Sequence, residues 1–237
     1  KELRHEDVKI LFHGDDEISL QKDDVMLEAL GTSLQVHLQI PFEKSVEFYH
    51  ASLFASVILT GFSANSPIVL GKKGWHESRI AIFEQSVDTR DKKRRDDGDE
   101  KRVHFAYKYI DSWIELFEQN KDFKIIFADL EDKQKDSLHH FNLHNGTVWR
   151  WIRPILDKTE DGKFSLRLEL RTLPSGPTLL DTEANIWFFI GLINGLVRSE
   201  IDIREIPFEV LKDDFYNSAR YGLKTKIHEP NEVNEVV

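Results

Sequence analysis

Residues 164–171 alternate between apolar and polar side chains, and this pattern limits what the second half of the chain can form. In order, the residues are Phe164, Ser165, Leu166, Arg167, Leu168, Glu169, Leu170 and Arg171. A repeat of two residues is typical of a β-strand that has one buried face and one polar face. The sequence therefore predicts a strand whose polar face carries Arg167, Glu169 and Arg171.

The stretch before this strand, residues 144–157, is predicted to pair with it. The connecting residues contain Asp161 and Gly162, a dipeptide typical of the turn in an antiparallel hairpin. On the polar face, guanidinium groups two residues to either side keep the Glu169 carboxylate ionised, as a metal or anion site requires. Alternating charges are also common on solvent-exposed strands, where ion pairs stabilise only weakly. Taken alone, this strand favours that simpler interpretation.

A second alternating segment, residues 33–40, has aliphatic side chains on one face and Gln35, His37 and Gln39 on the other. The polar face of a solvated strand is usually rich in lysine, glutamate and threonine. Glutamine and histidine instead offer neutral hydrogen-bond donors and acceptors, as an interior polar lining does. His37 is therefore a candidate site residue, although a single histidine on a strand is more often structural.

Apolar spacing and turn residues predict the remaining elements. A hairpin is expected from residues 8–12 and 16–20, and helices are expected at 43–64, 77–88, 105–120, 175–198 and 207–227. Thr178 or Asp181 is the expected cap of the fourth helix. Residues 122–143 are expected to hold a short strand and a polar helix or loop. The charged run at residues 88–102 is expected to be a solvated, mobile loop.

Composition restricts the class of protein. The chain has 237 residues, of which 40% are hydrophobic, so it can bury a large core, and we expect a single α+β domain over residues 1–237. The net charge of -10 argues against a nucleic-acid or anionic-membrane binder, and no stretch is long and apolar enough to span a membrane. The absence of cysteine excludes disulfides and thiolate sites and is compatible with a cytoplasmic location.

Five motifs together carry a resemblance to a known family. They are "SLQVHLQI" at 33–40, "GFSANSPIVLGKKGWHESRIAIFEQ" at 61–85, "HNGTVWRWIRPI" at 144–155, "LRLELRTLPSGPT" at 166–178 and "FYNSARYGLKT" at 215–225. In this order they resemble the carboxylate–amine ligase branch of the glutamate–cysteine ligase family, which is related to glutamine synthetase. The resemblance implies an antiparallel sheet with helices packed on one face, as in the catalytic fold of glutamine synthetase.

The resemblance also implies a reaction and its cofactors. Such enzymes use ATP, with Mg²⁺ or Mn²⁺, to convert a carboxylate, typically that of a glutamate side chain, into an acyl phosphate that an amine attacks. Carried over by position, the implied residues are His37 and Glu169 for metal, Arg167 and Arg171 for ATP, Arg153 and Arg171 for catalysis, and Arg153, Arg79 and Asn65 for substrate. A structural ion pair is an equal alternative for Arg79 and for Arg220, and a capping or turn role is the alternative for Asn65.

One element of the family pattern is missing from the sequence. Family members begin with a strand carrying a Glu-x-Glu pair that completes the metal site, and no such pair precedes residue 8. We therefore expect either an internal fragment of a longer ligase or a divergent member. The alternative function is a non-catalytic domain that binds a metabolite or a protein partner. The expected partners are small carboxylates and amines, with no nucleic acid and no membrane; a homo-oligomer is compatible with the sequence.

Overall fold

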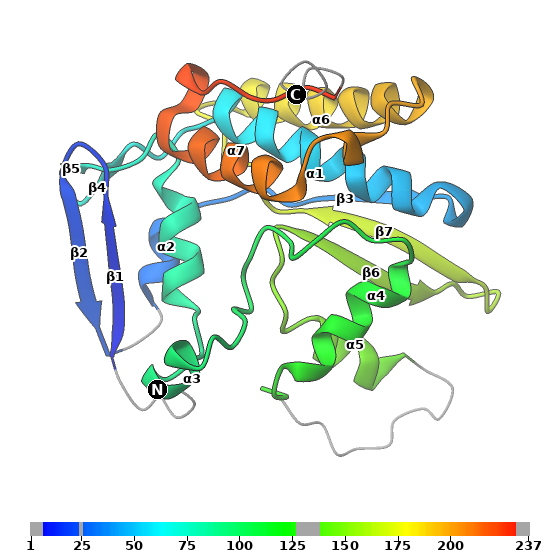
Figure 1. Ribbon diagram of the computed structural model, residues 1–237, viewed down its shortest axis with the longest axis horizontal. Helices are drawn as coiled ribbons and strands as arrows, with labels where there is room; N and C mark the ends of the chain where they lie inside the picture. The colour runs from blue at the N-terminus through cyan, green and yellow to red at the C-terminus, as the bar shows by residue number, and fades with distance from the viewer. Residues whose placement is uncertain (1–6, 24–25, 127–137, 231–237) are drawn as a thin grey trace.

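The computed structural model describes residues 7–23, 26–126 and 138–230 and has an α+β fold, as predicted (Figure 1). Its central sheet consists of β3 (Val36–Ile40), β7 (Phe164–Leu170) and β6 (Ile152–Lys158), in the order β3-β7-β6. Both pairs of neighbours are antiparallel. The predicted hairpin is thereby confirmed between residues 152–158 and 164–170, whereas residues 144–151 of the predicted stretch lie outside the strand. Strand β7 is the middle strand of the three.

The two faces of this sheet differ as the sequence pattern predicts. Leu166, Leu168 and Leu170 of β7 are buried on one face, against which α1 (Ser45–Phe62) lies. The other face carries the polar side chains. In the register, Glu169 lies opposite His37 of β3 and opposite Arg153 of β6. Three predicted site residues therefore form one row across the three strands.

A layer of helices covers the apolar face. In Figure 1, α1 lies between the sheet and the long helices α6 (Leu179–Arg198) and α7 (Phe208–Tyr221), and it contacts both of them. Thr178 is the N-cap of α6, as predicted, and forms a reciprocal capping box with Asp181. Helix α1 is buried over most of its length, whereas α6 buries only Asn185, Phe189 and Ile193.

A second group of elements lies beside the sheet. The predicted N-terminal hairpin is confirmed as β1 (Val8–His13) and β2 (Glu17–Lys22), and it packs against α2 (Ser78–Ser86). The remaining short elements are β4 (Ile68–Val69), β5 (Lys72–Lys73), α3 (Lys92–Asp96), α5 (His139–Asn145) and the 3-10 helices Met26–Leu30, Phe42–Lys44, Gln119–Asp122, Ile203–Glu205 and Gly222–Lys224.

The predicted helix over residues 105–120 is wrong in its first half. The α-helix here, α4, spans only Trp113–Glu118, because Ser112 and Glu115 form a capping box that starts it there. Residues 105–112 are irregular, with several bends and no regular secondary structure, and Phe105 stacks on Phe215 of α7 at a centroid distance of 4.5 Å. Packing between aromatic rings therefore overrides the helical spacing in this segment.

The charged run at residues 88–102 contains regular structure that the sequence analysis did not predict. Asp91 accepts a hydrogen bond from the backbone N–H of Arg94 and so caps the short helix α3. Arg102, at the end of the run, is buried and donates to the backbone oxygen of Thr147. The prediction for residues 122–143 falls partly on 127–137, which lie outside the described residues; the part that follows includes α5. Over the described part of the chain, no helix combines the length and apolar character needed to cross a membrane.

Candidate functional site

Glu169 is the centre of the polar face of the sheet. Its side chain has no exposed surface, yet three polar groups from three strands or strand ends surround its carboxylate. Arg153 of β6 donates through Nε to Oε2, and Arg171 donates through Nη1 to Oε1 at 3.2 Å. His37 of β3 places its Nε2 atom 3.4 Å from Oε1. The structure thus brings together four of the residues that the sequence predicted.

The two arginines are held in place by contacts on their other sides. Arg153 also donates from Nη1 to the backbone oxygen of Gly146, at 3.1 Å, just after α5. Arg171 lies 5.6 Å over the ring of Phe83 and is 12% exposed. Burial lowers the pKa of Arg171, and the nearby Glu169 carboxylate opposes that effect. Both guanidinium groups are therefore positioned before any ligand binds.

The charges around Glu169 do not cancel. One carboxylate faces two guanidinium groups, so this part of the sheet face carries a net positive charge. The Nε atom of Arg171 is buried and has no hydrogen-bond partner among the described residues. A buried donor without an acceptor costs about 1–3 kcal/mol. Because phosphate and carboxylate oxygens are the acceptors that guanidinium groups bind best, this donor set fits an anion such as the phosphates of ATP.

The residues fit a metal ion only in part. Among the described residues, no group of three or more histidine, cysteine, aspartate or glutamate side chains could hold one. His37 and Glu169 lie close enough to bind one side of a cation, but both Glu169 oxygens already accept from arginines. Mg²⁺ takes about six ligands, usually one or two carboxylates together with water and substrate phosphates. His37 and Glu169 would therefore contribute part of such a shell.

Arg167 lies next to this group on the same strand face. It contacts Asp157 of the neighbouring strand through Nη2, so much of its charge is already balanced. Its Nε atom, like that of Arg171, is buried without a partner in the described chain. Arg167 thus lies at the edge of the group, and its Nε–H can donate to one more acceptor.

The structure does not bring Arg79 into this group through its side chain. Arg79 is buried in α2 and donates from Nε to Glu77, at 2.8 Å, and from Nη1 and Nη2 to the backbone oxygens of Arg171 and Thr172. Its guanidinium also lies 5.4 Å over the ring of Trp151. These contacts support the structural alternative, in which Arg79 fixes the end of β7 and thereby positions Arg171.

Asn65 is likewise occupied by contacts within the fold. Its side-chain amide donates to the backbone oxygen of Ser175 at 2.9 Å, and its backbone N–H donates to Glu77 at 2.8 Å. The loop after α1 is thereby tied to the segment after β7. Arg220 is exposed and lies 4.8 Å over the ring of Trp75, without an ion pair in the described residues.

Two buried carboxyl groups lie behind the site and are not apparent from the sequence pattern. Glu77 has no exposed surface and accepts from both Asn65 and Arg79. Glu84 accepts from the indole N–H of Trp151 and the hydroxyl of Tyr216, each at 2.8 Å, and burial raises its pKa. Both glutamates lie within the family motif at residues 61–85, which is the one sign in the sequence that they matter. Their hydrogen-bond partners lie in distant segments and are visible only in the folded chain.

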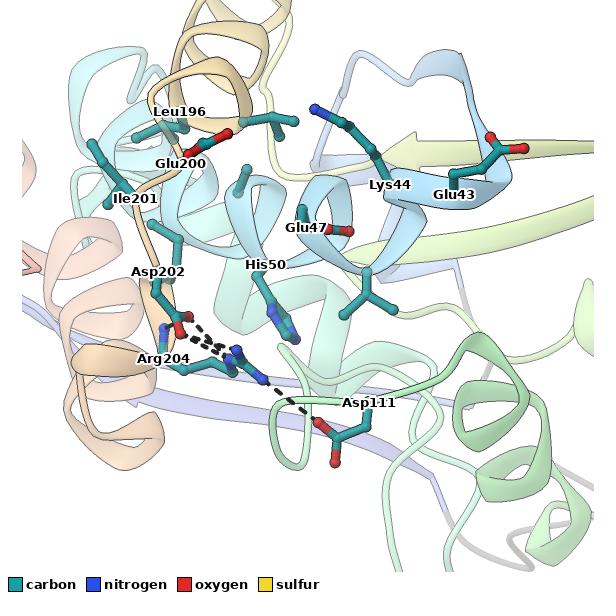
Figure 2. A pocket seen from close by; sticks show the side chains of 14 residues that line it. Glu43, Lys44, Glu47, His50, Asp111, Leu196, Glu200, Ile201, Asp202 and Arg204 are labelled. Atoms are coloured by element: carbon teal, nitrogen blue, oxygen red, sulfur yellow. Dashed lines mark hydrogen bonds and ion pairs between the residues drawn. The ribbon is translucent and has the colours of Figure 1, made fainter.

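A cavity of about 670 Å³ lies elsewhere, between the start of α1, the end of α6 and the loop at Asp111 (Figure 2). His50 lines it, and its Nε2 atom accepts from the backbone N–H of Ile110 at 3.2 Å. Burial lowers the pKa of His50 to about 4. At the cavity edge, Arg204 pairs with Asp202 at 2.9 Å and approaches Asp111 at 3.6 Å. None of the predicted site residues lines this cavity.

The chain was compared with known protein families, curated proteins and solved structures. The model of glutamate-cysteine ligase family 2 (GCS2) matches residues 11–237. Comparison with curated proteins and with solved structures gives no match. The family match covers nearly the whole chain and includes every predicted site residue, in agreement with the resemblance that the sequence motifs carry. The chain therefore belongs to glutamate-cysteine ligase family 2, a family of carboxylate–amine ligases.

Proposed function

We propose that the chain is the catalytic part of an ATP- and Mg²⁺-dependent ligase that joins a glutamate-like carboxylate to an amine. In this reaction ATP phosphorylates the carboxylate, the amine attacks the resulting acyl phosphate, and phosphate leaves as the amide forms. One observation carries the proposal: Arg153 and Arg171 converge on the buried carboxylate of Glu169 and leave an excess of positive charge on one sheet face.

The two arginines have the central role in this proposal. Phosphoryl transfer concentrates negative charge on oxygen atoms, and guanidinium groups that are already positioned stabilise this charge without reorganising. Arg171 would use its unpartnered Nε for this purpose. Arg153, fixed between Glu169 and the backbone of Gly146, would orient a substrate carboxylate or a phosphate oxygen.

Glu169 and His37 have a supporting role. Glu169 keeps both guanidinium groups in place and would bind a cation with its remaining coordination capacity. His37 is 39% exposed, so its imidazole can reach a ligand on the open side of the row. A bound Mg²⁺ ion would offset the charge of the ATP phosphates. Its other ligands would come from water and from those phosphates.

The test is amine-dependent ADP formation by the chain, with glutamate and a panel of amines in the presence of Mg²⁺. We expect Glu169→Gln to reduce the rate at least 100-fold, because the neutral amide no longer holds two guanidinium groups by charge. His37→Ala removes a partly exposed side chain and should raise the concentration of Mg²⁺ needed for half-maximal rate.

Glu209→Gln is the matched control, since Glu209 lies on the surface of α7 and, among the described residues, pairs with Lys212 alone, at 3.2 Å. It should leave the rate unchanged. Circular dichroism and thermal melting of each variant would separate a lost site from a lost fold. ADP formation at the wild-type rate by a folded Glu169→Gln variant would contradict the proposed role of this carboxylate.

A further inference from the structure

Helix α6 has an apolar face that the described chain leaves uncovered. We define the α6 stripe as the exposed residues along this face, which are Leu180, Ala184, Trp187, Gly191, Gly195 and Arg198. Leu180 is 75% exposed and Trp187 is 64% exposed. The spacing of three or four residues places all six on one side of the helix, opposite the buried Phe189 and Ile193. In Figure 1, α6 lies at the outer edge of the helical layer.

The two glycines of the stripe have no structural role within the described fold. A Cβ atom built at Gly191 or at Gly195 meets no atom within 4 Å. Each glycine inside a helix costs about 1 kcal/mol relative to alanine. Their small size therefore serves no packing need among the described residues. It does allow a second helix to approach closely along the stripe.

The shape of the stripe is complementary to itself. On a helix, residues i, i+3, i+4 and i+7 surround a hole into which a side chain from a neighbouring helix fits. Gly191, Asn194, Gly195 and Arg198 form such a hole, and two of its four corners carry no side chain. Trp187, one turn earlier on the same face, is the large exposed side chain that can fill the corresponding hole of a second copy.

The charges select the direction of the second helix. Glu183 borders the stripe near the start of α6, and Arg198 lies at its end. In the part of the chain that the structure describes, neither side chain forms an ion pair, and Glu183 accepts a hydrogen bond from the indole N–H of Trp187 at 3.4 Å. Two parallel copies would place like charges together at both ends. Two antiparallel copies would instead place Glu183 of each copy beside Arg198 of the other.

We propose that two copies of this chain associate through the α6 stripe as an antiparallel pair, with a two-fold axis near Gly191. Each Trp187 fills the hole formed by Gly191, Asn194, Gly195 and Arg198 of the other copy. Two Glu183–Arg198 ion pairs close the ends of the contact. Such a face, self-complementary in shape and charge, is what a two-fold interface requires.

The first test is the mass of the chain in solution, by analytical ultracentrifugation at protein concentrations from about 1 to about 100 μM. We expect the wild-type chain to form a dimer. Gly191→Leu should give a monomer of unchanged fold, because its side chain has space in the monomer but blocks the crossing point. A wild-type chain that stays monomeric would overturn the proposal, whether or not another partner covers the face.

The second test uses charge reversal and addresses the direction of the helices. Glu183→Arg and Arg198→Glu should each weaken dimerisation by roughly 5- to 30-fold, since each change alters both symmetric ion pairs. The double variant should restore the wild-type dissociation constant. Glu209→Arg on α7 is the control and should leave it unchanged. Failure of the double variant to recover would exclude the antiparallel register.

Discussion

At the scale of single residues, the site depends on which side chains already have all their hydrogen-bond donors paired within the fold. Arg79 and Arg171 are both arginines of the family motifs, and both are largely buried. Every nitrogen of the Arg79 guanidinium donates to Glu77 or to a backbone oxygen, whereas Arg171 retains an unpartnered Nε. This difference separates a positioning residue from one that can bind a ligand.

A first prediction concerns Arg79. Replacing it with alanine leaves the carboxylate of Glu77 buried without its cation, and we expect a loss of about 3–5 kcal/mol in the free energy of unfolding. The double variant Arg79→Met with Glu77→Gln removes both charges and should recover much of this loss. Urea denaturation followed by circular dichroism measures the free energy of unfolding of the single and the double variant. Equal losses for the single and double variants would show that the ion pair is not the cause.

At the scale of secondary structure elements, strand pairing and helix capping decide the geometry. The alternation in β7 determines that Arg167, Glu169 and Arg171 share a face, but the register with β3 and β6 determines which residues meet. A shift of one residue in either partner would move its side chains to the other face. The row of His37, Glu169 and Arg153 is therefore a property of three strands together.

A second prediction concerns the N-cap of α6. Thr178 accepts from the backbone N–H of Asp181, and the Asp181 side chain accepts in return from Thr178. Thr178→Ala should lower the free energy of unfolding by about 1 kcal/mol. Thr178→Ser keeps a hydroxyl that can cap the helix, so its free energy of unfolding should stay close to that of the wild type. Thermal and urea unfolding of both variants provides the measurement. An alanine variant as stable as the serine variant would show that the cap contributes little.

At the scale of the whole molecule, His50 joins three distant segments. From α1 it accepts the N–H of Ile110, and its ring lies 5.1 Å from that of Tyr109. The hydroxyl of Tyr109 in turn donates to the backbone oxygens of Ile203 and Ile206. The neutral imidazole therefore helps to hold α1, the Tyr109–Ile110 segment and the Ile203–Ile206 segment together, and it also lines the cavity shown in Figure 2.

A third prediction follows from the lowered pKa of His50, which is about 4 in the folded chain against an ordinary value of 6.5. Between these values the unfolded chain binds a proton that the folded chain excludes, so stability rises with pH across this window. We expect His50 to account for a loss of up to about 3 kcal/mol as the pH falls from 6.5 to 4.

The comparison with His50→Gln isolates this contribution from that of the carboxylates. Glutamine keeps an acceptor for Ile110 but does not titrate, so its free energy of unfolding should vary less between pH 6.5 and pH 4. Urea denaturation at a series of pH values gives both profiles. Parallel profiles for the two proteins would show that another group causes the pH dependence.

Sequence patterns alone predict the alternating strands, most of the helices, the capped start of α6 and the family. These features depend on local periodicity, on turn and cap residues, and on motifs that are visible without contacts. For this reason the polar face with His37, Glu169 and Arg171 could be predicted before the strands were placed.

Packing between distant segments sets which predicted residues remain available to a ligand and which surfaces the described chain leaves uncovered. Arg79 and Asn65 look as suitable as Arg171 in the sequence, but distant groups such as Thr172 and Ser175 occupy them. The non-helical backbone of residues 105–112 likewise depends on rings from α7. The exposure of Trp187 depends on which side of α6 the core covers. In each case the physical reason is the same: burial and hydrogen bonding are set by residues far away in the chain, which local sequence patterns do not contain.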